Sequence, residues 1–500
     1  MHFFRKNLPL LLKSYFILAL LIISALVGLT CFSGYFNVNF DEILYLNYGR
    51  MFSEANSLKT PFTANELSSP AGGFGWYGPF YNIIYGCVFK VLGASHNSMV
   101  VFHYILFLLC FLVIKYLPLS TLKRWIFACV FISSYIAGPF VLTAYPETIH
   151  LFLSLVLVLV YSKLNDSKKL FFLYLFLIFF FSLIRITFIF WVFSILFLKD
   201  IRISLWIRFT ICIAFVLGIL VYARLCNTPS SVQGLSEVYY AKADSIFTSL
   251  KNILNNFKTN VYMLYNQSSG SVMLFLVLIG IAAFNLLTLN KKEAFRSKNT
   301  GLMLVIVMTT SVFLFFYLSE FYYLEKQTGF LIPLLIYIII STRKNILLLL
   351  VLSLIVFLPY SMIRSVNNFQ ERKNSYYDVE KDADLYKEMS HIFDGVRVNA
   401  EEEICVLHFE PDFDVIENYL YAYMPLEHSG NPIIYTCLAY NKSKPNEFNK
   451  TAIPLEKKFA TFGRYKINYV LSRYPLNFPN IKCVKTNKYY YLYYCPGFHL

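Results

Sequence analysis

Apolar runs long enough to cross a lipid bilayer constrain this chain more than any other feature. The first, Tyr15 to Phe32, follows the basic residues Arg5, Lys6 and Lys13. It is too long for a removable signal peptide and lacks a small-residue cleavage site, so we expect a retained membrane helix. Of all residues, 57% are hydrophobic and only 15% are charged, against roughly 25% charged in soluble domains. The sequence therefore predicts a polytopic α-helical membrane protein.

The apolar runs predict about eleven transmembrane helices, since a span needs about 20 apolar residues. They lie at residues 14–33, 98–117, 125–141, 148–163, 169–184, 186–199, 203–223, 271–290, 301–319, 328–341 and 345–361. Only Arg185 separates the fifth run from the sixth.

Basic residues fall in every second connection between these spans. They are Lys123 and Arg124; Lys163, Lys168 and Lys169; Lys199 and Arg202; Lys291, Lys292, Arg296 and Lys298; Arg343 and Lys344. Cytoplasmic loops carry such an excess of Lys and Arg, so the pattern predicts a cytoplasmic N-terminus. It also explains the net charge of +15 without a nucleic-acid partner. The alternation holds only if Arg185 divides two spans, and an odd number of spans places the C-terminal segment outside.

This topology predicts a transmembrane domain, residues 1–361, and an extracytoplasmic domain, residues 362–500. The first outer loop, residues 34–97, is long, and we expect two helices in it that lie in the membrane interface. One runs from Asp41 to about Ala55, and the other starts at Pro79 and stops at Gly93. A second outer segment, residues 224–270, contains an amphipathic stretch from Ile246 to Leu254.

Short strand-like runs in the tail predict a small α/β domain on the outer face. The runs lie at residues 404–409, 432–437, 467–471 and 489–494, with a helix expected at 414–424. The ten cysteines contain no CxxC pair, so no zinc or redox motif is indicated. Because a turn is expected at 485–488, we predict a disulfide between Cys483 and Cys495, with two free thiols on strands out of register as the alternative.

Carboxylates on the outer side are the candidate catalytic residues. Asp41 and Glu42 follow the first span, and Asp41 is the candidate general base. The alternative is a solvated acidic pair that helps to stop translocation or caps the next helix. Glu147 follows the third span after Pro146, where it could instead only stabilise the start of a helix. The aromatic residues Trp76, Tyr77 and Tyr145 are expected to line the substrate cavity.

Basic residues at the membrane are the candidate phosphate ligands. Arg185 must form a pair, snorkel to headgroups or bind an anion, and a guanidinium offers a bidentate fork to a lipid phosphate. Lys326, in an aromatic outer loop, is a candidate second contact. His103 and His150 are expected to have ordinary structural roles. No metal site and no cofactor are predicted, although the carboxylates do not exclude binding of a divalent metal.

The order of these motifs resembles the type C glycosyltransferases (GT-C). That superfamily includes the protein O-mannosyltransferases and the lipid A aminoarabinose transferase. The resemblance covers residues 1 to about 200: the acidic pair Asp41–Glu42, the helix from Pro79 to Gly93, Pro146–Glu147 and Arg185. The chain departs from the pattern at Gly78, where relatives carry Pro or Lys, and at residues 325–327, where relatives often carry Arg-Tyr. The topology is also similar to that of bacterial O-antigen glucosyltransferases.

The resemblance implies a hexosyltransferase in the bacterial inner membrane. Its donor would be a polyprenyl-phosphate sugar, and its acceptor a lipopolysaccharide, an O-antigen or another cell-surface glycan. The alternatives are an O-antigen polymerase or ligase, which commonly uses arginine-rich outer loops, and a lipid-linked sugar transporter or flippase, which would show two related halves. A structural scaffold would leave Arg185 unexplained.

Overall fold

The chain divides into two compact units. Residues 1–34, 100–224 and 230–370 form the helical unit, and residues 35–99, 225–229 and 371–500 form the mixed unit. The computed structural model describes residues 2–33, 40–59, 78–137, 145–164, 167–198, 203–226, 245–266, 278–283, 298–316, 329–342, 370, 383–398, 404–410, 424–429, 431–439, 468–473, 475–476 and 481–495. The mixed unit thus combines the predicted first outer loop with the predicted C-terminal domain.

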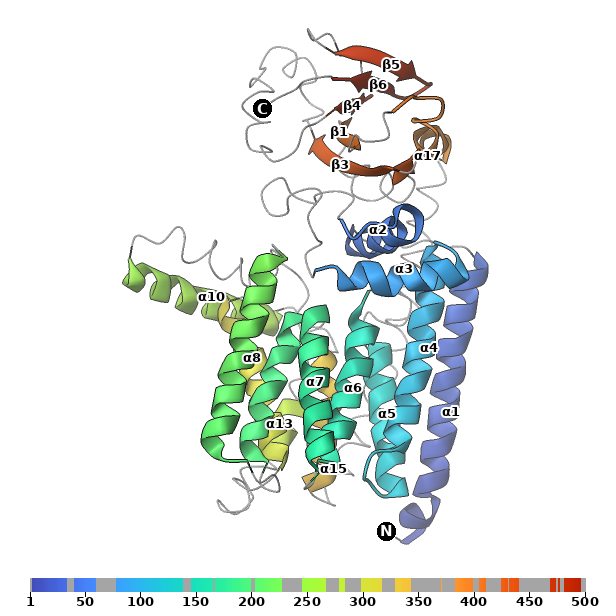
Figure 1. Cartoon of the computed structure of the whole chain (residues 1–500). Coiled ribbons are helices and arrows are strands. Elements are labelled where there is room, and N and C mark those ends of the chain that lie inside the picture. Colours follow the sequence, from blue (N-terminus) through green and yellow to red (C-terminus); the bar gives the residue numbers. More distant parts are fainter. Residues whose placement is uncertain are drawn as a thin grey trace. The chain divides into compact units, whose positions relative to one another are not determined.

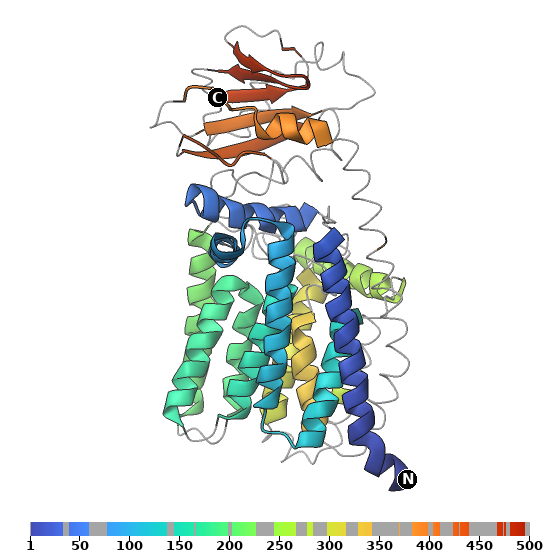
Figure 2. The same ribbon diagram turned by 90° about the vertical axis from the view of Figure 1, so that its right-hand side faces the viewer.

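Helices make up the helical unit, and most of them lie side by side (Figures 1 and 2). They are α1 (His2–Ser33), α4 (His96–Lys115, of which residues 96–99 group with the mixed unit), α5 (Thr121–Ala137), α6 (Glu147–Ser162), α7 (Lys168–Ile184), the 3₁₀ helix η1 (Ile186–Phe197), α8 (Leu205–Leu225), α10 (Ile246–Asn266), α13 (Lys298–Phe316), the short 3₁₀ helix η2 (Gly329–Leu331) and α15 (Ile332–Thr342).

Four helices of the described residues are long and apolar enough to cross a membrane. They cover Leu8–Phe32, His96–Lys115, Leu205–Tyr222 and Lys298–Phe315. Shorter apolar helices of this unit lie at Glu147–Ser162, Ile186–Phe197 and Gly329–Ser341. The chain is a helical membrane protein. The predicted span at 345–361 lies outside the described residues, and the count of about eleven stays a prediction.

Hydroxyl pairs join α1 to its neighbours within the apolar bundle. The Tyr15 hydroxyl is hydrogen-bonded to Ser133 of α5, and Ser24 Oγ lies 2.6 Å from the Tyr104 hydroxyl of α4. Polar side chains that bond across helices in this way contribute to helix association in a bilayer, where the hydrophobic effect between helices is absent.

Arg185 ends α7 and separates it from η1, as the charge pattern predicts. Its backbone is extended, with φ −144° and ψ 115°, and η1 begins at the next residue. η1 continues for 12 residues as a 3₁₀ helix, whereas 3₁₀ runs longer than about four residues are uncommon. It packs against α7 and α13. A Cβ at Gly301 of α13 would overlap the Tyr161 hydroxyl and lie 3.0 Å from the Ser194 carbonyl oxygen.

Basic residues close the ends of three helices at one end of the helical unit. Arg124 Nε donates to the Leu117 carbonyl, 3.0 Å away, just after α4. Lys298 donates to the Leu164 carbonyl after α6, and Arg208 donates to the Ile195 and Leu198 carbonyls at the end of η1. Helix C-termini leave carbonyl groups unsatisfied and favour positive charge. Arg124 and Lys298, which the sequence assigns to cytoplasmic loops, therefore also cap helices, whereas Arg208 does so from within a predicted span.

Two helices of the mixed unit pack closely against each other. They are α2 (Phe40–Ala55) and α3 (Phe80–Leu92). Pro79 caps the start of α3, and Gly93, at φ 84°, ends it. Both helices were predicted from the sequence with nearly these bounds. Glycines allow their close approach, because a Cβ at Gly49 would lie 2.6 Å from the Phe89 ring, and one at Gly86 would overlap Phe52.

A six-stranded sheet and helix α17 (Ala383–Ser390) complete the mixed unit (Figure 1). The strands are β1 (Ile404–Glu410), β2 (Glu427–His428), β3 (Asn431–Ala439), β4 (Tyr469–Ser472), β5 (Lys482–Thr486) and β6 (Tyr491–Tyr494). Their order is β2-β3-β1-β4-β6-β5. β1 is parallel to β3 and β4, and the other pairs are antiparallel. The predicted strands are thus present, whereas most of the predicted helix at 414–424 lies outside the described residues.

The predicted disulfide between Cys483 and Cys495 is wrong. Both cysteines are free, with Cys483 exposed and Cys495 buried. The hairpin itself forms around Asn487, but its register sets Cys483 opposite Tyr493, with an irregularity between Cys483 and Lys485. Cys495 instead continues alongside β4, where its amide donates to the Asn468 carbonyl, 2.8 Å away. The strands form as expected, but their offset separates the two thiols.

Candidate functional site

The first turn of α6 presents a buried acid and a buried histidine. Pro146 precedes the helix, and Glu147 is its first residue. Glu147 and His150 are three positions apart and so share one helix face. Their side chains are 7% and 2% exposed, respectively. Tyr145, a predicted cavity residue, is also buried just before this turn.

Arg185 reaches this turn from the break between α7 and η1. Its Nη1 lies 2.6 Å from Nδ1 of His150. A guanidinium can only donate hydrogen bonds, so Nδ1 must accept, and the proton of the neutral imidazole must sit on Nε2. The Phe330 ring lies 5.3 Å from Arg185 Cζ, close enough for a cation–π contact. The polar cluster therefore joins α6, the α7–η1 junction and η2.

Arg185 is only 5% exposed. It is hydrogen-bonded to His150, and a side chain this buried does not extend into solvent. The cluster lies at the end of α6 opposite Lys163, which caps its C-terminus. Polar and ionisable groups buried in a membrane-spanning bundle are expensive and are usually functional. Binding of an anion by Arg185 stays a prediction.

The acidic pair lies in the mixed unit. Asp41 and Glu42 occupy the first turn of α2, where carboxylates interact favourably with the helix dipole. Glu42 is 1% exposed, whereas the side chain of Asp41 lies outside the described residues. Glu147, Tyr145 and Arg185 belong to the helical unit, so the structure describes each group within its own unit.

Three further predicted site residues, Trp76, Tyr77 and Lys326, lie outside the described residues. Their roles as cavity residues and phosphate contact stay predictions. Within the described part of the chain, no group of three or more His, Cys, Asp and Glu side chains is arranged to hold a metal ion.

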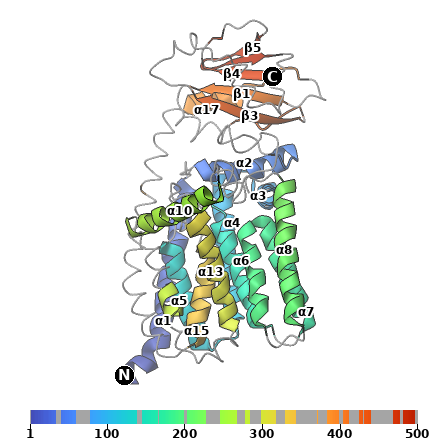
Figure 3. The ribbon, with the colours of Figure 1, turned by 90° about the vertical axis from the view of Figure 1, so that its left-hand side faces the viewer.

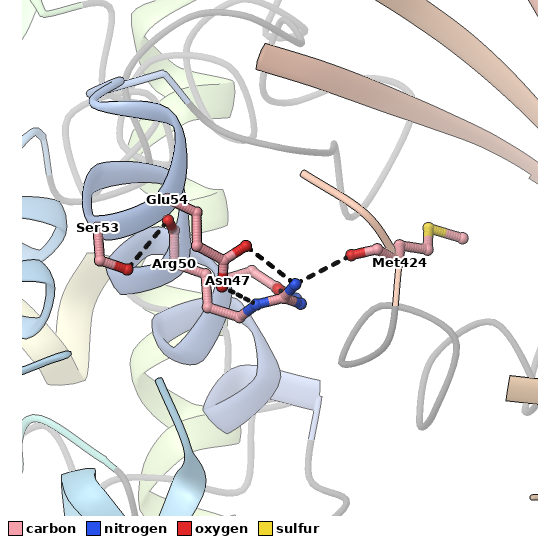
Figure 4. Close-up of polar contacts among 5 residues, drawn as sticks. All are labelled: Asn47, Arg50, Ser53, Glu54 and Met424. Atoms are coloured by element: carbon pink, nitrogen blue, oxygen red, sulfur yellow. Dashed lines mark hydrogen bonds and ion pairs between the residues drawn. The ribbon is translucent and has the colours of Figure 1, made fainter. Parts of the chain in front are cut away.

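Arg50 connects the helix that carries the acidic pair to the segment between β1 and β2 (Figure 4). Its Nε donates to Glu54 Oε1, 2.8 Å away, and its Nη1 donates to Asn47 Oδ1, 3.2 Å away. Its Nη2 also donates to the Met424 carbonyl, 3.2 Å away. Met424 precedes β2, so one guanidinium fixes α2 to the C-terminal part of the mixed unit.

Sequence reasoning missed two of these residues. His150 was expected to be an ordinary structural histidine, yet it is the hydrogen-bond partner of Arg185. Its signal was the spacing from Glu147, which puts both on one face of the helix. Arg50 was not considered, although its four-residue spacing to Glu54 is that of an ion pair along a helix.

Comparison with protein-family models and with curated proteins finds no match to the sequence. Among solved structures, the chain is similar to the crystal structure of ArnT from Cupriavidus metallidurans bound to undecaprenyl phosphate. The TM-score is 0.49 at 8% identity, over 96% of this chain and 97% of that one. It is also similar to ArnT from the same organism in the apo state, with a TM-score of 0.45 at 10% identity, over 95% of this chain and 97% of that one. ArnT belongs to the group that the sequence motifs resemble. Both TM-scores lie below 0.5, so the assignment of function rests on the residues of this chain.

Proposed function

We propose that the chain is an inverting glycosyltransferase that takes a hexose from a polyprenyl phosphate on the outer face of the bacterial inner membrane. The observation that carries the proposal is the buried cluster at the start of α6. There Glu147 lies one turn before His150, which accepts a hydrogen bond from the Arg185 guanidinium. A buried carboxylate and a buried guanidinium at one end of a membrane bundle suit a charged lipid headgroup better than an apolar core.

The residues have complementary roles in this reaction. Asp41 accepts the proton of an acceptor hydroxyl as the general base, with Glu42 and Glu147 as further catalytic carboxylates. The hydroxyl oxygen then bonds to the anomeric carbon while the bond from that carbon to the phosphate oxygen breaks. Attack opposite the leaving group inverts the anomeric configuration. Arg185 and Lys326 stabilise the charge that develops on the departing lipid phosphate.

The proposed acceptor is a lipopolysaccharide, an O-antigen or another cell-surface glycan. Trp76, Tyr77 and Tyr145 line the proposed substrate cavity, because aromatic rings offer apolar faces together with hydrogen-bonding edges. The proposed reaction requires no cofactor, and carboxylates are also a type of ligand that divalent metals accept.

The test follows a labelled sugar in proteoliposomes. They contain the purified protein, undecaprenyl phosphate carrying a radiolabelled hexose, and lipopolysaccharide from cells that lack the gene. We expect the label to move to lipopolysaccharide with release of one undecaprenyl phosphate per sugar. Glu54→Gln, on α2 but paired with Arg50, is the control that should leave transfer unchanged.

The same experiment separates the alternatives. Label that reaches the other leaflet while still attached to its lipid would indicate a flippase. Joining of whole glycan repeats would indicate a polymerase or ligase. Either result, in place of transfer of single sugars, would overturn the proposal.

A further inference from the structure

Helix α10 carries an apolar stripe that is exposed along its length. Phe247, Leu250, Leu254 and Val261 are 79%, 54%, 61% and 43% exposed, respectively. Their spacings of three, four and seven residues place them on one face of the helix. Exposed apolar side chains that are contiguous in this way mark an interaction surface. We call this face the α10 stripe.

The other face of α10 is fixed to α13. Asn256 Nδ2 donates to the Phe315 carbonyl, 3.0 Å away, and Asn260 Nδ2 donates to the Leu314 carbonyl, 2.8 Å away. The rings of Phe257 and Phe315 stack with their centroids 4.6 Å apart. The asparagines satisfy carbonyl groups that the end of α13 would leave without partners. α10 is therefore an anchored element with a defined free face.

The anchor point fixes the level of α10 relative to the bilayer. α13 contains a candidate span, Lys298–Phe315, and the residues that α10 contacts are the last of that span. Since a spanning helix of this length just covers the hydrocarbon core, its final turn lies at the membrane surface. Figures 1 and 3 show α10 running across the direction of α8 and α13 rather than along it. α10 thus lies at the level of the lipid headgroups.

Charge identifies the partner. Lys251 and Lys258 are exposed, and their seven-residue spacing places both beside the α10 stripe. The 21 residues of α10 include no Asp or Glu. A helix with an apolar face flanked by lysines binds a membrane surface and favours anionic lipids. A second copy of the same helix fits less well, because its lysines would meet lysines.

We propose that α10 is a membrane-docking helix. Its stripe inserts among the acyl chains, and Lys251 and Lys258 contact the headgroups of anionic phospholipid. Through Asn256 and Asn260, this docking also holds the end of α13. The proposal depends only on α10 and its anchor, and it stands whether or not the chain transfers sugars.

Photo-crosslinking of the full-length protein tests this placement. Benzoylphenylalanine is introduced singly at position 250 or 254 on the stripe, and at position 255 or 259 as controls; Asn255 and Thr259 are exposed but lie on the polar side. The protein is placed in nanodiscs of equal parts phosphatidylcholine and phosphatidylglycerol and irradiated. Mass spectrometry then measures the fraction that carries a covalently bound lipid. We expect lipid adducts at 250 and 254 and few at 255 and 259.

The lysines are tested by the kind of lipid captured. Replacing Lys251 and Lys258 by Gln should lower the ratio of phosphatidylglycerol to phosphatidylcholine among the adducts by roughly fivefold for each lysine. Lys482→Gln, on exposed β5, should leave that ratio unchanged. Equal adducts at all four positions, or crosslinks between two protein copies in place of lipid, would overturn the docking. An unchanged ratio in the Gln variants would overturn the role of anionic headgroups.

Discussion

Arg185 and His150 form a buried hydrogen bond of 2.6 Å between the α7–η1 junction and the first turn of α6. Because the guanidinium can only donate, this contact sets the tautomer of the imidazole as well as the position of the arginine. It holds a positive charge in the end of the bundle where the sequence places its outer carboxylates.

Replacing His150 by Leu removes the acceptor of a buried charged donor. We expect the free energy of unfolding to fall by about 1.5–3 kcal/mol, the usual range for a hydrogen bond to a charged group. His150→Gln keeps an acceptor oxygen and should restore part of the loss. Chemical denaturation of the purified protein in detergent measures both. A Leu variant as stable as the wild type would show that the contact contributes little.

Replacing Arg185 tests the proposed contact with the donor phosphate. Arg185→Ala should raise the apparent KM for polyprenyl-phosphate sugar, lower kcat, or both, because the leaving phosphate loses its cation. Arg185→Lys should recover activity only in part, since a point charge cannot replace a planar fork. Initial rates at varied donor concentration provide the measurement. Normal use of the donor by both variants would restrict Arg185 to a structural role.

Asp41→Asn keeps the size of the side chain and removes the proposed base. We expect sugar transfer to fall by roughly 10²-fold or more, the scale for a lost general base. The variant should still insert into the membrane and fold, as thermal unfolding and gel filtration would report. Transfer at a near wild-type rate by a folded variant would falsify the assignment.

Gly86→Ala should loosen the contact between α2 and α3. The new Cβ would lie 2.6 Å from the Phe52 Cβ, which belongs to the rigid base of that side chain, so the helices must move apart. Overpacking of this kind costs about 1–3 kcal/mol. Gly218→Ala in α8, where no atom lies within 4 Å, is the matched control and should be neutral or slightly stabilising. The two variants are compared by thermal unfolding, and equal midpoints would contradict the close packing.

Cys483 and Cys495 should differ sharply in their reaction with iodoacetamide. Burial raises the pKa of the Cys495 thiol to about 12, and only the thiolate is nucleophilic. In the folded protein near pH 8, Cys483 should be modified while Cys495 remains free, and modification of Cys495 should rise with increasing pH or on unfolding. Peptide mapping gives the extent at each site. Recovery of the two peptides joined without reductant would instead establish the disulfide.

Features set by local sequence could be predicted. Pro79 and Gly93 define the ends of α3, because proline has a fixed φ and Gly93 adopts φ 84°. The break at Arg185 followed from the alternation of basic loops, which depends on insertion rather than on packing. The strands of the sheet followed from short β-branched and aromatic runs between turns.

Features set by packing between distant segments could not be predicted. The partner of Arg185 is 35 residues away in the chain, and an apolar run gives no indication of which face meets which. The 3₁₀ winding of η1 is equally hidden, since its sequence suits either kind of helix. The β5–β6 offset arises from an irregularity between Cys483 and Lys485, and so small a shift is enough to separate two cysteines.

The winding of η1 determines how far a short segment reaches. A 3₁₀ helix rises about 2.0 Å per residue and an α-helix about 1.5 Å, so the 12 residues of η1 extend about 24 Å instead of about 18 Å. That added length brings a run too short for an ordinary span close to the thickness of the hydrocarbon core. His150 holds one end through Arg185, and Arg208 holds the carbonyls at the other. Relaxation to an α-helix would shorten the segment by about 6 Å, so the contacts at its two ends favour the longer 3₁₀ form.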